Sequence, residues 1–253
     1  MQWFSGSQNA APEQVLRVME TLRDRLQSEL GDDLISLSAY GDFVKPGEYD
    51  PRRSEVNLML VLAGISTPVL DRLVDAIATA KRKVRIAVMI LTEEDLVQSC
   101  DVFPIKFVDM QEHHRLICGR DVLSDLKIAD DHLRLRCEQE LKNLMIRLRA
   151  IYLSRAKKFD LLRDAMTESI GSLLRLLAIG LTLKTGISPE ENAEVIAACR
   201  DEFGLDLTVL QTVLDVRHRS SVLPATEIPT VYNDYMKAVH DAATAIDRLE
   251  SQV

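Results

Sequence analysis

The stretch that decides the fold is SAYGDFVKPGEYDPRRSEVNLMLVL, residues 38–62. It opens as the end of a strand, breaks at Gly41 into a loop of Gly, Pro and charged residues over 42–54, and resumes as an apolar run. Glu55 and Asn57 stand two apart at the start of that run. On a strand, two such positions point to the same face. The pattern therefore predicts two polar side chains aimed at a ligand beside the loop.

The flanking sequence predicts a mixed α/β unit. Before the stretch, apolar residues recur at helical spacing from about Pro12 to Leu30, and Gly31 follows as a stop. The run over 55–64 is apolar on both faces, which is typical of a central strand. The remaining expected elements are a strand over 34–40, a helix from an N-cap at Ser66 to the basic run at 81–83, a buried strand over 84–92, a short helix opened by Thr92, and a strand over 103–110 that ends in the carboxylate of Asp109.

The second half predicts helices only. Residues 130–153 carry an apolar stripe, and 159–186 is apolar nearly all round, as expected for the central helix of a bundle. Three further helices are expected: one from Ser188 to about Gly204, with Pro189 and Glu191 in its first turn, one over 207–218, and one over 231–249. We expect an α/β domain with a mixed sheet over 12–125, followed by an all-α bundle of about five helices over 126–253.

Composition limits the classes of function. The net charge of −8 argues against broad nucleic-acid binding, which needs dense Lys and Arg surfaces. The N-terminus has neither the basic flank nor the apolar stretch of a signal peptide, and the richest apolar run is interrupted by Arg175, so no membrane span is expected. The four cysteines are scattered and are interpreted as reduced core thiols: Cys100, Cys118, Cys137 and Cys199. A cytoplasmic protein is expected.

The order of these features resembles the nucleotidyltransferase superfamily, the DNA polymerase β-like group that includes kanamycin and other aminoglycoside nucleotidyltransferases. Its pattern is Gly-Ser before a loop, two acids two residues apart at the start of the next strand, and a third carboxylate on a later strand. Gly41 matches the Gly, and Asp42 stands in place of Ser. Glu55 and Asn57 stand in place of the paired acids, and Asp109 matches the third carboxylate. The resemblance covers roughly residues 12–120.

The resemblance implies transfer of a nucleoside monophosphate from an NTP to a hydroxyl of a small molecule or protein. Glu55, Asn57 and Asp109 would be the catalytic and Mg²⁺-binding residues, and the helical bundle would close one side of the cleft. The nucleotide would be bound at Gly41, Asp42 and Arg53, because a glycine turn lets backbone N–H groups approach phosphates. The basic residues of the 42–54 loop either meet phosphate oxygens or solubilise an exposed loop.

Three substitutions leave an alternative open. Asp42 adds negative charge where phosphates would lie, Glu55 is one methylene longer than Asp, and Asn57 offers Mg²⁺ a neutral oxygen. The alternative is a catalytically weak or inactive protein of the same fold that binds a nucleotide or a partner. An antitoxin-like partner of a separate helical toxin is a third interpretation, and a homodimer is possible in any of them.

Structural roles also compete for the same residues. Glu55 is equally suited to pair with Arg52 or Arg53 at the rim of the sheet, Asn57 to tie down a loop, and Asp109 to cap a turn. His113 and His114 are adjacent, so on a helix their side chains diverge by about 100° and do not ligate one metal together.

Overall fold

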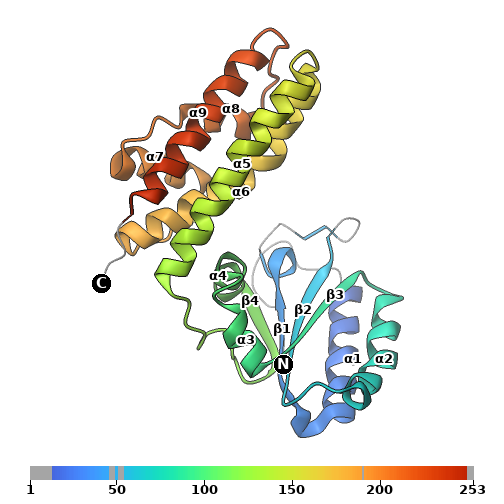
Figure 1. Cartoon of the computed structure of the whole chain (residues 1–253). Helices are drawn as coiled ribbons and strands as arrows, with labels where there is room; N and C mark the ends of the chain where they lie inside the picture. The colour runs from blue at the N-terminus through green and yellow to red at the C-terminus, as the bar shows by residue number, and fades with distance from the viewer. Residues whose placement is uncertain (1–12, 46–48, 51–53, 190, 250–253) are drawn as a thin grey trace. The chain divides into compact units, whose positions relative to one another are not determined.

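The computed structural model describes residues 13–45, 49–50, 54–189 and 191–249, and the chain divides into two units (Figure 1). One unit is Met1–Ile128 and the other is Ala129–Val253. Arg53, expected to bind the nucleotide, lies outside the described residues, as does Arg52.

A four-stranded mixed sheet forms the centre of the first unit. The strands are β1 (Leu34–Tyr40), β2 (Val56–Leu62), β3 (Ile86–Thr92) and β4 (His114–Gly119), in the order β3-β2-β1-β4. β1 runs antiparallel to both of its neighbours, while β2 and β3 are parallel and are joined through α2 (Thr67–Lys81). β2 therefore lies inside the sheet, as its apolar sequence predicts.

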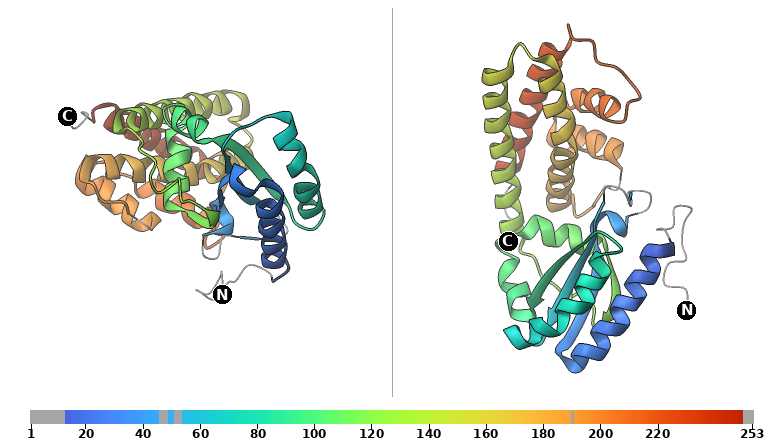
Figure 2. Two further views of the ribbon diagram at one scale, coloured as in Figure 1. Left: turned by 90° about the horizontal axis from the view of Figure 1, so that it is seen from below. Right: turned by 90° about the vertical axis from the view of Figure 1, so that its right-hand side faces the viewer.

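Two helical layers cover the two faces of this sheet (Figures 1 and 2). One face packs against α1 (Glu13–Leu30) and α2, and the other against α3 (Glu93–Ser99) and α4 (Pro104–Glu112). Along β2, Leu58 and Leu60 belong to the first core, whereas Met59 and Val61 belong to the second. Because side chains alternate along a strand, Asn57 faces the α3 and α4 layer.

The structure corrects the sequence-based predictions in three places of this unit. Residues 104–112 form α4 rather than the expected strand, so Asp109 lies on a helix. The strand over 114–119 was not predicted. β3 is an edge strand whose residues after Ile86 are only partly buried, rather than a buried strand. By contrast, α3 begins after Thr92 as expected, with a capping box between Thr92 and Asp95.

The second unit is a bundle, and the part of it that the structure describes contains helices only. They are α5 (Asp130–Arg155), α6 (Phe159–Thr185), α7 (Asn192–Phe203), α8 (Thr208–Arg217) and α9 (Ile228–Asp247). α7 begins after an N-cap at Glu191, so the start expected at Ser188 was wrong. α6 is long and apolar enough to span a membrane, and 61% of its most apolar window is buried, as in the core helix of a soluble protein.

Candidate functional site

The turn after β1 is the centre of the candidate site. Tyr40 pairs with Asn57 across the sheet, so the turn that follows Tyr40 lies beside the start of β2. Gly41 has a φ of 75°, and a Cβ built there would lie 3.0 Å from Nδ2 of Asn57. A left-handed φ and a close neighbour both favour glycine. The structure thus brings Gly41 and Asn57 into contact.

Asp42 fixes the far end of the loop. It is exposed in the short 3₁₀ turn Gly41–Phe43, and its Oδ2 accepts a hydrogen bond from the Ser54 hydroxyl at 3.4 Å. The Ser54 hydroxyl also accepts from the backbone N–H of Asp50 at 3.2 Å. Asp42 therefore has a structural partner just before β2, a role that its position in the sequence did not reveal.

Glu55 points to the neighbouring strand. Its Oε1 lies 3.6 Å from Nη2 of Arg85, just before β3, and about half of each side chain is exposed. An ion pair with this exposure contributes little to stability. The Arg85 guanidinium lies on the side of the Glu55 carboxylate that a bound cation would also approach.

Asp109 is held by two basic groups. Its Oδ1 lies 3.4 Å from Nζ of Lys45 and 3.4 Å from Nδ1 of His113, which is four residues further along at the end of α4. The backbone N–H of Gly41 donates to the carbonyl of His113 at 3.4 Å, so the end of α4 also contacts the turn. Lys45, His113 and Asp109 therefore border the turn that Asn57 contacts.

These contacts sort the predicted residues into two groups. Gly41, Asp42 and Asn57 surround the turn, and Asp109 is linked to the same segment through Lys45 and His113. Glu55 is paired with Arg85 instead. From the sequence, His113 was considered only as a metal ligand and discounted, and Ser54 was not singled out. Helical spacing from Asp109 to His113 would have indicated the first, but only if 104–112 had been predicted as a helix.

The donor set does not fit a two-magnesium centre. On the neighbouring strands, Asn57 is paired with Tyr40 and Ala87, and neither residue has a carboxylate that could join Asn57 in binding a metal ion. Within the described residues, no group of three or more His, Cys, Asp and Glu side chains is placed to hold a metal ion. Mg²⁺ prefers charged oxygens in octahedral geometry, and here one position is an amide and both carboxylates face cations.

Comparison with known proteins supports the fold. No protein-family model and no curated protein sequence matches the chain. Among solved structures, it is similar to the crystal structure of spectinomycin adenyltransferase AAD(9) from Enterococcus faecialis with ATP and spectinomycin. The identity is 16% and the TM-score 0.50, over 89% of this chain and 99% of that chain. The protein therefore has a nucleotidyltransferase-like fold, a mixed-sheet α/β domain followed by helices.

Proposed function

We propose that the first unit binds a nucleoside triphosphate at the Gly41 turn and that nucleotidyl transfer is weak or absent. The observation that supports this most directly is the contact between Gly41, with its positive φ, and the Asn57 amide at the mouth of β2. A glycine turn beside a neutral hydrogen-bond donor suits a phosphate, whereas an acidic pair at that place would need metal ions to offset its charge.

The surrounding side chains have definite parts in this proposal. The Asn57 amide donates to a phosphate oxygen. The Lys45 ammonium exchanges Asp109 for the phosphate, since its distance of 3.4 Å from this carboxylate is long for a charge-assisted hydrogen bond. His113 remains beside Asp109, with its Nδ1 at 3.4 Å from the carboxylate. Asp42, held by Ser54, disfavours anions on its side of the turn and directs the triphosphate toward Asn57.

A second candidate is the active reaction, transfer of a nucleoside monophosphate to a hydroxyl of a small molecule. Its support is the similarity to an adenyltransferase whose crystals contain ATP and spectinomycin. It requires Mg²⁺ held by Glu55, Asn57 and Asp109, and therefore requires Glu55 and Asp109 to leave Arg85 and Lys45. Because position 57 is a neutral amide and no group of three or more His, Cys, Asp and Glu side chains among the described residues is placed to hold a metal ion, binding without transfer is the better supported function.

Calorimetric titration of ATP, with and without Mg²⁺, separates the two candidates. We expect binding that does not depend on Mg²⁺, about tenfold weaker in Asn57→Ala and unchanged in Asn143→Ala, an exposed asparagine of α5. Incubation with α-labelled ATP and spectinomycin should yield no labelled product. Mg²⁺-dependent binding with product would establish the second candidate instead, and absence of ATP binding in both buffers would refute both.

We place this activity in the cytoplasm. All four cysteines are free thiols, which suits a reducing compartment. Burial raises the pKa of Cys137 and of Cys199 to about 12, so both stay protonated and unreactive at neutral pH.

A further inference from the structure

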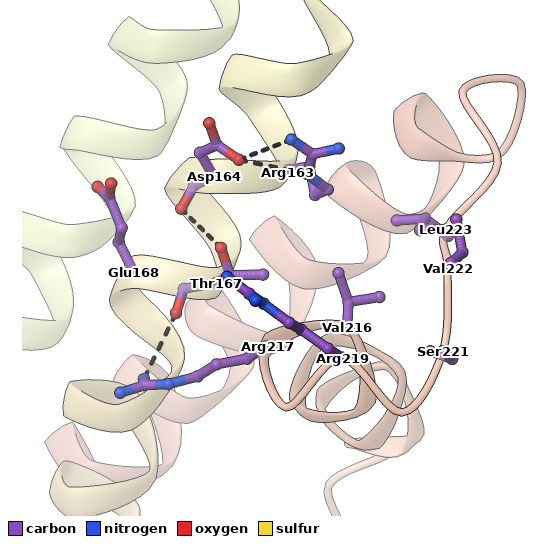
Figure 3. Close-up of a pocket in the computed structure, with 10 residues that line it drawn as sticks. All are labelled: Arg163, Asp164, Thr167, Glu168, Val216, Arg217, Arg219, Ser221, Val222 and Leu223. Atoms are coloured by element: carbon purple, nitrogen blue, oxygen red, sulfur yellow. Dashed lines mark hydrogen bonds and ion pairs between the residues drawn. The ribbon is translucent and has the colours of Figure 1, made fainter.

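The helical unit contains a cavity of about 840 Å³ between α6 and the end of α8 (Figure 3). Its walls come from one turn of α6, the last residues of α8 and the loop that follows α8. This volume is within the range of small-molecule sites. The cavity lies wholly inside the second unit and contains none of the residues around Gly41.

Arginines dominate the charge of this cavity. Arg163 is compensated, because its guanidinium lies 3.0 Å from Asp160 and 3.0 Å from Asp164. For Arg217 and Arg219, no carboxylate of the described residues lies within 4.0 Å. Of the lining residues only Glu168, which is exposed, remains as an opposing acid. The lining side chains therefore comprise three guanidinium groups and two carboxylates, those of Asp164 and Glu168.

The position of Arg217 depends on a glycine. Its side chain crosses to α6, where Nη1 lies 3.4 Å from the carbonyl oxygen of Thr167 (Figure 3). A Cβ built on Gly171, one turn further along α6, would lie 2.7 Å from the same Nη1. A larger residue at 171 would push the guanidinium aside. The surface of α6 is thus shaped to leave room for Arg217.

Arg219 occupies a place where glycine would be more stable. It follows the C-cap His218 of α8 with a φ of 59°, in the left-handed region. The backbone N–H of Ser220 donates to the backbone carbonyl of Asp215 at 2.9 Å, and the backbone N–H of Arg219 donates to the carbonyl of Val216 at 3.1 Å. This is the hydrogen-bonding pattern of a Schellman motif. Glycine is the usual residue at this position, because other residues pay in free energy for the conformation. Figure 3 shows the Arg219 side chain running from the end of α8 toward Thr167.

We propose that this cavity binds the phosphate group of a small molecule through Arg217 and Arg219. A guanidinium group can donate two parallel hydrogen bonds to two oxygens of one phosphate. Two guanidinium groups carry a charge of +2, which matches a phosphate dianion better than it matches the single negative charge of a carboxylate. The Ser221 hydroxyl lines the same wall and adds a donor, and the neighbouring Val222, 91% exposed, offers an apolar surface to the rest of the ligand. The ligand class is a phosphate monoester small enough for the cavity.

Inorganic phosphate is the probe for the first test. The thermal unfolding midpoint of the full chain is measured against phosphate concentration, with chloride at equal ionic strength as the baseline. We expect a phosphate-dependent rise in Tm for the wild type. Arg219→Gly should raise the Tm without phosphate, because glycine relieves the left-handed φ, and should weaken phosphate binding at least tenfold. Arg217→Gln and Gly171→Ala should weaken it as well.

Two controls make the outcome specific to this cavity. Arg200→Gln removes an exposed arginine of α7 that does not line the cavity and should keep the wild-type response. In an Asn57→Ala background, which removes the contact proposed for the nucleotide, Arg219→Gly should still reduce the phosphate-dependent rise in Tm, which separates this proposal from the proposed function. A wild type with no phosphate-specific rise, or an Arg219→Gly variant that is stabilised yet binds phosphate as the wild type does, would overturn the proposal.

Discussion

The conformation of Gly41 matters because it sets the path of the chain between β1 and the loop. Its φ of 75° and the 3.0 Å approach of Asn57 to the Cβ position make any other residue unfavourable. Gly41→Ala should lower the free energy of unfolding by about 1–2 kcal/mol, the usual cost of the left-handed region for an L-residue. Urea unfolding at pH 7 measures this loss.

Gly64→Ala is the matched control for that change. Gly64 follows β2, and a Cβ there would meet nothing within 4 Å. We expect it to be neutral or slightly stabilising, because alanine restricts the unfolded chain. Equal losses in the two variants would show that the positive φ of Gly41 is not the cause.

A second residue-scale prediction concerns Asp121, after β4. Burial raises the pKa of its carboxyl. Hydrogen bonds from the backbone N–H and hydroxyl of Ser124 and from His114 together lower this pKa by more than burial raises it, so the net shift is downward. A depressed pKa adds stability above the unfolded pKa of about 3.9, and this stability is lost as the pH falls through the folded pKa. Asp121→Asn should therefore destabilise the protein at pH 7 and much less at pH 3.

Urea unfolding at the two pH values tests this, with Asp125→Asn as the comparison. Asp125 is an exposed residue of the same loop. Its replacement should leave the difference in unfolding free energy between pH 7 and pH 3 close to that of the wild type. The prediction fails if Asp121→Asn is as destabilising at pH 3 as at pH 7.

At the scale of elements, two helices of the first unit begin in different ways. The Thr92 hydroxyl accepts from the N–H of Asp95 at 3.0 Å, and Asp95 accepts from the N–H of Thr92 at 2.9 Å. Ser66 occupies the N-cap of α2 without a side-chain capping bond. Thr92→Ala should cost about 1 kcal/mol of stability, and Ser66→Ala only a few tenths, as measured by urea unfolding. Similar losses from both would contradict the capping assignment.

α4 is the element at which the sequence pattern was most misleading. Phe103, Ile105 and Phe107 alternate as a strand would, yet Phe103 is 51% exposed while Phe107 and Met110 are buried, which is helical spacing. Pro104 was the available signal, because proline favours the first turn of a helix and removes a donor from a strand. β4 was missed for a different reason. Its short sequence carries two polar residues, and its pairing with β1 is a distant contact that local periodicity does not reveal.

At the scale of the whole molecule, the mixed α/β unit followed by a helical bundle was predictable because long periodic segments carry strong local signals. The candidate site was predictable only where it lies along one turn and one strand, as for Gly41 and Asn57. Lys45 and Asp109 are 64 residues apart, and their contact depends on where α4 packs against the sheet. A local sequence pattern does not predict a contact between residues so far apart along the chain.

Two buried tyrosines of α9 connect this helix to α5 and α6 within the helical unit. The Tyr232 hydroxyl donates to the Leu148 carbonyl of α5 at 2.8 Å, and the Tyr235 hydroxyl is 2.9 Å from the Ser169 hydroxyl of α6. Burial raises the pKa of each tyrosine to about 12, against about 10 in an unfolded chain. A raised pKa means that this stabilisation is complete below about pH 10 and is lost as the pH approaches about 12.

The unfolding free energy of the wild type should therefore fall steeply between about pH 10 and about pH 12, since unfolding lets both hydroxyls ionise. Tyr232→Phe with Tyr235→Phe should be less stable at pH 8, because two buried hydrogen bonds are lost at about 1 kcal/mol each, but should fall less with pH. Urea titrations followed at 222 nm give both values. If the double variant keeps the full alkaline slope, other groups are responsible for the loss.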